Sequence, residues 1–239
     1  MSDFLTENLK EVERRIQAAC DRAGRSREEV TLIAVSKTKP VEMLKAVYDA
    51  GSRNFGENKV QEMCDKMEVL PSDIRWHMIG HLQTNKVKYI VGRTALIHSV
   101  DSLHLAEEIE RQAAKKDVAV PILIEVNIAQ EESKFGIRTD EAAALVRAAA
   151  QLPHIRVRGL MTIAPYVDDP EDNRAYFRGI RQLSVDIAGE NIDNVSMECL
   201  SMGMTGDYEV AVEEGATMIR VGTGIFGERD YSRILFGGQ

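Results

Sequence analysis

Eight short apolar runs alternate with segments of helical spacing, and this alternation constrains the fold more than any other feature of the sequence. The expected runs cover residues 31–37, 53–58, 74–80, 95–102, 121–127, 157–164, 195–203 and 217–224. Charged residues concentrate in the segments between them, which is typical of parallel strands buried on both faces. Eight such units in 239 residues predict an α/β protein, a single (β/α)8 barrel over residues 1–239, with an open doubly wound sheet as the alternative.

A further helix is expected ahead of the first strand. Residues 3–23 place apolar side chains at helical spacing, and Gly24 follows as a stop signal. This N-terminal segment is charged from the start and lacks the apolar region of a signal peptide, and no run approaches the roughly 18 apolar residues of a membrane span. We therefore expect a cytoplasmic protein with no membrane partner.

Charge and cysteine content exclude several kinds of site. A formal net charge of -8 argues against a nucleic-acid-binding surface, since a basic patch supplies most of that affinity. The three cysteines are widely separated and include no C-x-x-C pair, so reduced thiols are expected rather than zinc or disulfide chemistry. His77 and His81 fall on one strand about 13 Å apart, too far to chelate one metal ion. The sequence predicts no metal site.

The stretch MIRVGTGIFG contains a literal G-x-G-x-x-G at Gly222, Gly224 and Gly227. A dinucleotide fingerprint also needs a crossover helix, a second strand and an acidic residue about 20 positions on, whereas twelve residues follow Gly227. The motif is therefore interpreted more narrowly. It is either a glycine turn that closes the last strand or a set of backbone N–H groups that can hold one phosphate.

In a (β/α)8 barrel, functional side chains lie at the carboxyl ends of the strands. Lys37 ends the first apolar run on the same face as Ile33 and Val35. A lysine there is either a surface residue or a buried amine able to form a Schiff base. Asn58 ends the second run. His81 directly follows the third run, where a histidine either contacts a ligand or holds the following loop in place.

The last two strands supply the remaining candidate residues. Ser201 begins a glycine-containing turn near the end of the seventh run, and Gly222 with Thr223 lies near the end of the eighth, beside the loops where this fold usually binds phosphate. Arg220 is expected to point inward, either toward a ligand or in an ion pair with Glu125. A Schiff-base lysine, a phosphate cradle and an inward arginine together describe a site for pyridoxal 5'-phosphate (PLP).

With these residues in place, the sequence resembles the pyridoxal phosphate homeostasis (YggS/PROSC) family, whose barrel is similar to the N-terminal domain of alanine racemase, a type III PLP fold. The segments that carry the resemblance are LIAVSKTKP, FGENKVQE, WHMIGHLQTNK, HSVDS, GLMTIAPY and LSMGMTGDYEVAVEEGATMIRVGTGIFGER. They follow one another over nearly the whole chain.

The resemblance implies roles for individual residues. It implies that Lys37 forms the Schiff base with PLP and that Arg220 lies against the pyridine nitrogen. The other PLP-binding residues that it implies are Asn58, His81, Ser201, Met202, Gly222 and Thr223. It also implies a role in PLP homeostasis, with apo forms of PLP-dependent enzymes as partners.

Whether such a protein is an enzyme depends on the arginine. A permanently protonated guanidinium does not readily protonate the pyridine nitrogen, so the ring becomes a poor electron sink. We therefore expect a PLP-binding protein with no established catalytic residue. We also expect the protein to be a monomer. One alternative is an enzyme with weak racemase-like activity, with Tyr166 or His81 as its second base. The other is a cofactor-free aldolase in which Lys37 attacks a sugar phosphate.

Overall fold

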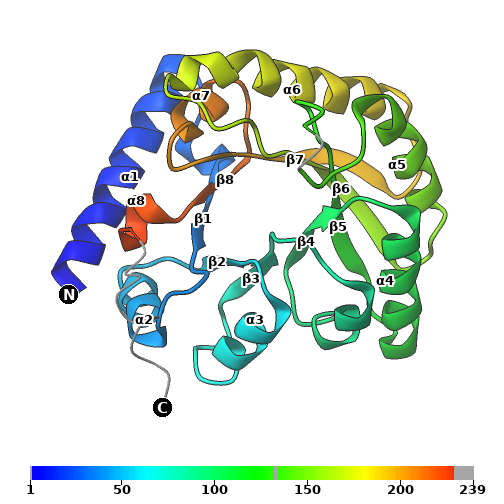
Figure 1. Cartoon of the computed structure of the whole chain (residues 1–239), viewed down its shortest axis with the longest axis horizontal. Coiled ribbons are helices and arrows are strands. Elements are labelled where there is room, and N and C mark those ends of the chain that lie inside the picture. Colours follow the sequence, from blue (N-terminus) through cyan, green and yellow to red (C-terminus); the bar gives the residue numbers. More distant parts are fainter. Residues whose placement is uncertain (1, 132–133, 229–239) are drawn as a thin grey trace.

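The computed structural model describes residues 2–131 and 134–228 and contains a closed, fully parallel barrel in the order β1 to β8 (Figure 1). The strands are β1 (Thr31–Val35), β2 (Asn54–Glu57), β3 (Arg75–Met78), β4 (Leu96–Val100), β5 (Val120–Glu125), β6 (Ile155–Met161), β7 (Val195–Met204) and β8 (Met218–Val221). Pairing of β8 with β1 closes the ring. The barrel is therefore confirmed, and the open sheet is excluded.

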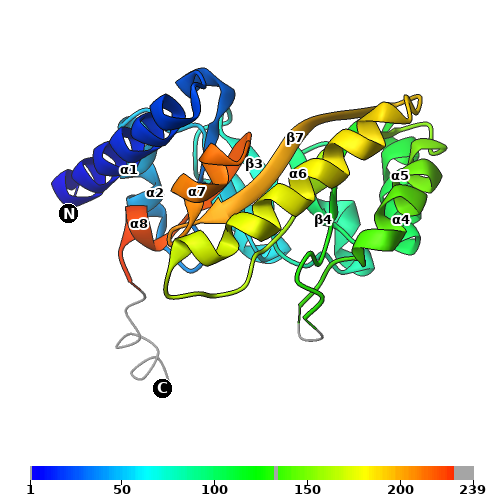
Figure 2. The ribbon, with the colours of Figure 1, turned by 90° about the horizontal axis from the view of Figure 1, so that it is seen from above.

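Helices surround the barrel (Figures 1 and 2). The α-helices are α1 (Ser2–Ala23), α2 (Val41–Asp49), α3 (Val60–Met67), α4 (Leu103–Lys116), α5 (Ala142–Ala150), α6 (Arg174–Gly189), α7 (Tyr208–Glu213) and α8 (Thr223–Phe226). Short 3-10 helices are η1 (Arg27–Glu29), η2 (Thr84–Tyr89), η3 (Thr139–Glu141) and η4 (Pro170–Asn173). Among the residues that the structure describes, no helix is both long and apolar enough to cross a membrane.

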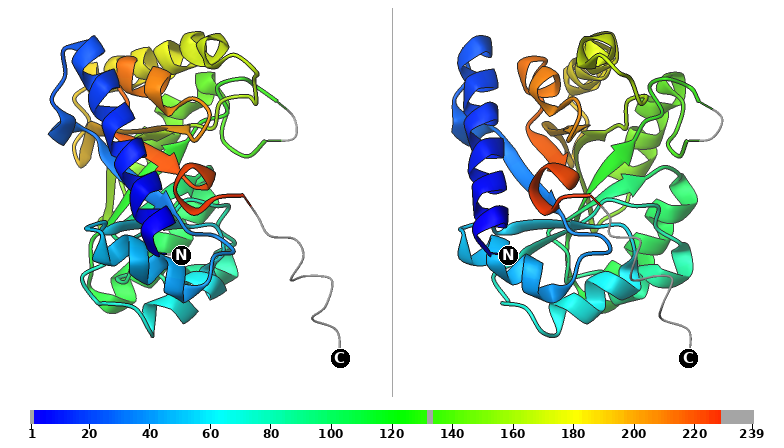
Figure 3. Two further views of the ribbon diagram at one scale, coloured as in Figure 1. Left: turned by 90° about the vertical axis from the view of Figure 1, so that its left-hand side faces the viewer. Right: turned by 60° about the vertical axis from the view of Figure 1, so that its left-hand side comes forward.

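The predicted N-terminal helix is present as α1, which contacts α2, α7 and α8 outside β1 and β8 (Figure 3). The helical segment that follows β3 is η2, a 3-10 helix. Its N–H groups bond three residues back, as from Lys86 to the Gln83 carbonyl (3.0 Å) and from Ile90 to that of Val87 (3.1 Å). Gly92 follows with φ +77°, so the chain turns before a regular α-helix can extend.

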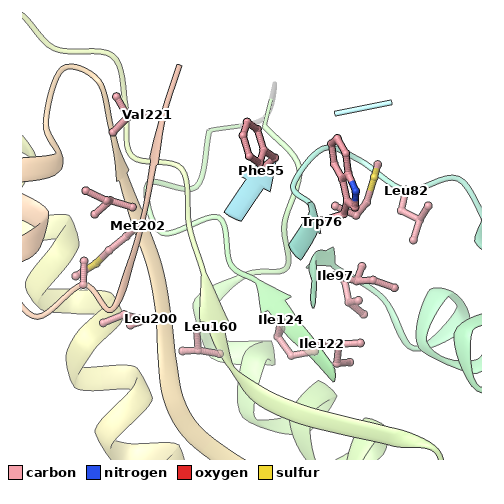
Figure 4. Close-up of a cluster of buried hydrophobic side chains, with 14 of the residues drawn as sticks. Phe55, Trp76, Leu82, Ile97, Ile122, Ile124, Leu160, Leu200, Met202 and Val221 are labelled. Carbon is pink, nitrogen blue, oxygen red and sulfur yellow. The ribbon is translucent and has the colours of Figure 1, made fainter. Parts of the chain in front are cut away.

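Side-chain alternation divides the sheet into two faces. Outward-facing residues such as Phe55, Ile97, Ile122 and Leu200 join the helices in one large buried core, part of which is shown in Figure 4. Inside the barrel, residues of several strands form a second apolar cluster, which includes Leu96, Leu123 and Met161. The interior of the barrel also holds buried polar side chains, among them His77, His98 and Arg220.

Candidate functional site

A cavity of about 760 Å³ opens at the carboxyl ends of the strands. It is large enough for a small cofactor, for which pockets of roughly 300–1,000 Å³ are typical. Five of the residues singled out from the sequence line it: Lys37, Asn58, Arg220, Gly222 and Thr223. Strands β1, β2 and β8 therefore deliver these residues to one place, as the strand-end reasoning predicts.

Lys37 lies in a tight turn directly after β1. The Ser36 N–H donates to the Gly56 carbonyl on β2 (3.0 Å), and the Lys39 N–H returns to the Ser36 carbonyl (3.0 Å). Thr38 takes φ +63°, a left-handed conformation that is unusual for a β-branched residue. Contacts on both sides of Lys37 thus define its backbone.

The loops after β7 and β8 meet at a hydroxyl group. Thr205 Oγ1 accepts hydrogen bonds from the N–H groups of Gly222 and Gly224, both at 3.3 Å. A Cβ added at Gly224 would lie 2.9 Å from the Val221 side chain and 3.2 Å from the Thr205 side chain, so a larger residue would displace them. Gly224 thus leaves room for the Thr205 side chain beside Thr223 at the wall of the cavity.

Arg220 is 4 % exposed, and its partners are neutral groups. Its Nη1 donates to Ser201 Oγ at 2.6 Å, and its Nη2 donates to the Thr162 carbonyl at 2.8 Å. Among the ion pairs of the described residues, none joins Arg220 to Glu125, so the direct pair considered from the sequence is not formed. Burial lowers the pKa of Arg220 to about 10, although the charges of Glu125 and Asp207 oppose this effect. The guanidinium remains a cation at neutral pH.

Glu125 lies at the end of β5 and is 4 % exposed. Burial raises the pKa of its carboxyl to about 7, the charge of Asp101 adds to this rise, and Arg220 opposes it. Its Oε2 atom has no hydrogen-bond partner among the described residues. Glu125 therefore gains and loses a proton near neutral pH without pairing with Arg220.

Behind Arg220, a chain of neutral side chains crosses the interior of the barrel. Ser201 Oγ lies 3.0 Å from His98 Nδ1, His98 Nε2 lies 2.9 Å from His77 Nδ1, and His77 Nε2 lies 3.0 Å from Asn54 Oδ1. Because the Asn54 oxygen can only accept, each group donates to the next in one direction away from Arg220. Burial lowers the pKa of His77 to about 3 and that of His98 as well, so both rings are neutral.

The other three predicted site residues lie elsewhere. Ser201 is fully buried and bonds to Arg220 and His98. Met202, on the opposite face of β7, is fully buried in the outer core (Figure 4). His81 lies at the surface, stacked on Phe135 with ring centroids 4.2 Å apart, and its side chain is 40 % exposed.

Comparison with known proteins identifies the family. The model of the alanine racemase N-terminal domain matches residues 8–230. A relative from Aquifex aeolicus named pyridoxal phosphate homeostasis protein is 48 % identical over 226 residues, which cover 94 % of this chain and 98 % of the relative.

The chain belongs to the pyridoxal phosphate homeostasis protein family. The resemblance inferred from the sequence is thereby confirmed. Among solved structures, PipY of Synechococcus elongatus with PLP bound is 34 % identical, with a TM-score of 0.79 and coverage of 93 % of this chain and 100 % of PipY. An alanine racemase of Clostridium difficile, only 13 % identical, shares the fold with a TM-score of 0.75 over 95 % of this chain and 57 % of the racemase.

Thr205 and Lys39 also line the cavity and were not selected from the sequence, whereas Tyr166, considered there as a second base, lines it as well. Lys39 Nζ donates to the carbonyls of Gly227 (2.9 Å) and Glu228 (3.0 Å) and so connects the turn after β1 to the chain beyond α8. Tyr166 is 94 % exposed at the mouth of the cavity. A signal for Thr205 existed, since a hydroxyl beside a glycine after the seventh strand suits phosphate binding.

Proposed function

We propose that this protein binds PLP as a Schiff base on Lys37 and contributes to PLP homeostasis by holding the reactive aldehyde. The observation that carries the proposal is the meeting, in one cavity, of Lys37, the backbone around Gly222 and Thr223, and the buried cation of Arg220. The names of the relatives and the PLP-bound PipY structure support it.

The residues present fit PLP. The Lys37 amine would add to the aldehyde carbon, and loss of water would leave a C=N bond between them. Backbone N–H groups near Gly222 and Thr223, with the Thr205 hydroxyl, would hold the phosphate. Arg220, whose observed partners are neutral, would donate to the pyridine nitrogen, while Asn58 would contact the ring.

Ser201 would act through Arg220 rather than on PLP, because its hydroxyl accepts from the guanidinium. His81 and Met202 remain family-based proposals for PLP contacts. His81 would reach a ligand only after moving from Phe135, and Met202 would contribute through its backbone.

We further propose that the protein is not a robust enzyme. When bound, PLP can stabilise a carbanion at the α-carbon of an amino acid, but a protonated arginine at the ring nitrogen weakens that electron sink. The second candidate function is weak racemase-like activity. The position of Tyr166 at the cavity mouth favours it, because this phenol could serve as a base opposite Lys37.

The remaining proposals concern the setting of the protein. We infer that residues 1–239 act as one PLP-binding domain, monomeric and cytoplasmic, with apo PLP-dependent enzymes as recipients of the cofactor. The negative net charge of -8 disfavours nucleic acid as a partner.

The visible absorption spectrum of the purified protein mixed with PLP, before and after borohydride reduction, tests the proposal. We expect a band near that of a protonated Schiff base, its loss on reduction, and a stable mass increase on the Lys37 peptide. Lys37→Ala should lack all three, whereas Lys45→Ala, at an exposed position of α2, should behave like wild type.

A protein that takes up no PLP would overturn the proposal and favour the aldolase alternative. Exchange of amino-acid α-protons into deuterated water separates the carrier from the enzyme. Exchange that Lys37→Ala abolishes and Tyr166→Phe greatly slows would establish the racemase-like alternative.

A further inference from the structure

A buried lysine on α3, Lys66, lies behind the candidate site. Its side chain is 6 % exposed, which is rare for lysine unless its charge is paired. Its Nζ lies 2.8 Å from the Ser36 carbonyl, 2.7 Å from Glu57 Oε1 and 2.7 Å from Glu62 Oε1. An ammonium group has three protons to donate, so these three acceptors satisfy it.

Each acceptor is also connected to the turn that carries Lys37. Ser36 precedes Lys37, and the Ser36 hydroxyl donates to the same Glu57 oxygen at 2.6 Å. Glu62 Oε1 accepts the Thr38 N–H at 2.6 Å, on the other side of Lys37. The cluster of Lys66, Glu57 and Glu62 therefore contacts both chain neighbours of Lys37.

The Lys37 turn needs such support. Thr38 has φ +63°, and the left-handed region carries a free-energy cost for a β-branched residue. A conformation of this cost persists only where the surroundings over-determine it. The hydrogen bonds from the Thr38 N–H to Glu62, from Lys66 to the Ser36 carbonyl and from the Ser36 hydroxyl to Glu57 do so.

The same cluster reaches Asn58. Glu57 is fully buried, and Asn58 is the next residue at the end of β2. A Cβ at Gly80 would lie 2.5 Å from the Asn58 carbonyl, so the loop after β3 packs closely on this strand end.

Charge ties the cluster together. Burial raises the pKa of Glu57, and the charge and hydrogen bond of Lys66 are the largest effects that oppose this rise. Removal of the lysine would thus leave a buried carboxylate without its cation and favour its protonation. Geometry and charge both make Lys66 the centre of the cluster.

We propose that Lys66 is a positioning residue which, through Glu57 and Glu62, fixes the Ser36–Thr38 turn so that the Lys37 amine meets an incoming aldehyde in a reactive orientation. Lys66 itself lies outside the cavity lining. The inference rests on the proposed function of Lys37, and it predicts a slower reaction of this amine rather than weaker binding of the rest of PLP.

Glu62→Ala is the sharpest test, because it removes the acceptor of the Thr38 N–H and leaves the pair of Lys66 and Glu57 intact. Full-length apo protein is mixed with PLP, and the rate of covalent adduct formation is followed by absorbance and borohydride trapping. Binding of pyridoxine 5'-phosphate, which has an alcohol in place of the aldehyde, is measured in parallel. We expect an approximately tenfold slower reaction with affinity for this analogue within about twofold of wild type, since misplacement of a reacting group costs rate.

Two variants serve as controls. Gln61→Ala changes the neighbouring residue on the solvent side of α3 and should react like wild type. Glu62→Gln keeps a side-chain oxygen for the Thr38 N–H and should recover most of the rate. Amide hydrogen exchange of residues 36–39, measured without ligand, should quicken in Glu62→Ala and stay slow in both controls.

The outcomes separate the two proposals. If wild type forms no adduct with PLP, the proposed function fails. If wild type reacts and Glu62→Ala reacts equally fast, only the positioning inference is overturned. It is also overturned if reaction rate and analogue affinity fall together, because the cluster would then support the whole cavity rather than Lys37.

Discussion

Two buried polar networks support the candidate site from opposite sides, and they differ in charge. Behind Arg220, the chain through Ser201, His98 and His77 is neutral. Behind Lys37, the cluster around Lys66 pairs one ammonium group with two carboxylates. The first network fixes a cation without neutralising it, whereas the second pairs a cation with carboxylates and fixes a backbone turn.

The two cations therefore differ in whether they can attract a ligand. The charge of Arg220 stays available to the cavity, whereas carboxylates already pair with Lys66. A cation held by neutral dipoles keeps its attraction for an acceptor in the cavity, which a carboxylate partner would cancel. The neutral network is also sensitive to acid. Unfolded histidine titrates near pH 6.5 and folded His77 near 3, so the unfolded state takes up the proton first, and the stabilisation from this ring is lost as the pH falls from 6.5 toward 3.

The largest expected effect follows from breaking the charged network. Lys66→Met should lower the free energy of unfolding by about 3–5 kcal/mol at pH 7, because it leaves Glu57 buried without a cation. Urea denaturation gives the value. Lys10→Met, which breaks an exposed pair with Glu7 on α1, should cost no more than about 1 kcal/mol. Equal losses of unfolding free energy in the two variants would show that the buried pair stabilises the protein no more than the exposed pair does.

A smaller loss is expected from the neutral network. Ser201→Ala removes the link between Arg220 and His98 and should lower the free energy of unfolding by about 1–3 kcal/mol, the cost of unpaired buried groups. It should also shift the absorption band of bound PLP, because the guanidinium loses a fixed partner. Ser196→Ala, also on β7 but outside this network, is the control. An unchanged absorption band in Ser201→Ala would show that this network does not influence the bound ligand.

The smallest change concerns Glu125, whose carboxyl faces Arg220 without an ion pair. Its pKa rises from 4.5 in the unfolded chain to about 7 in the fold, so the native state binds the proton more tightly and loses stability as the pH rises between these values. Glu125→Gln should therefore stabilise the protein by about 1–2 kcal/mol at pH 8 and much less at pH 5.

Urea denaturation of Glu125→Gln at the two pH values makes this comparison. Glu107→Gln, at an exposed position of α4, should shift neither value. A stabilisation by Glu125→Gln that is the same at pH 5 and pH 8 would contradict the raised pKa of Glu125.

The fold was predictable because each strand is short and apolar on both faces, and the barrel follows from the number of strands. Strand alternation also placed Lys37 and Arg220 correctly toward the interior. Thr205 was missed because the expected seventh run ends at residue 203, whereas β7 continues to Met204 and brings the next residue to the cavity.

The two supporting networks were harder to predict from the sequence. Glu62 and Lys66 are four residues apart on a helix, a spacing typical of exposed ion pairs, and the packing of α3 on the barrel buries Lys66 but leaves Glu62 partly exposed. His98 lies within an apolar run where a single polar residue has many possible roles. Its partner His77 is 21 residues away on the neighbouring strand, so their contact depends on the pairing of β3 with β4.

The polar layer inside the barrel also has a consequence for protein design. A guanidinium transplanted alone into the aliphatic interior of another barrel would be a buried charge with nothing to fix its orientation. To reproduce Arg220, a designer would need to graft side chains from several strands together, with every donor of the chain pointing the same way. The arginine can therefore be transferred to another barrel only together with the side chains that hold it.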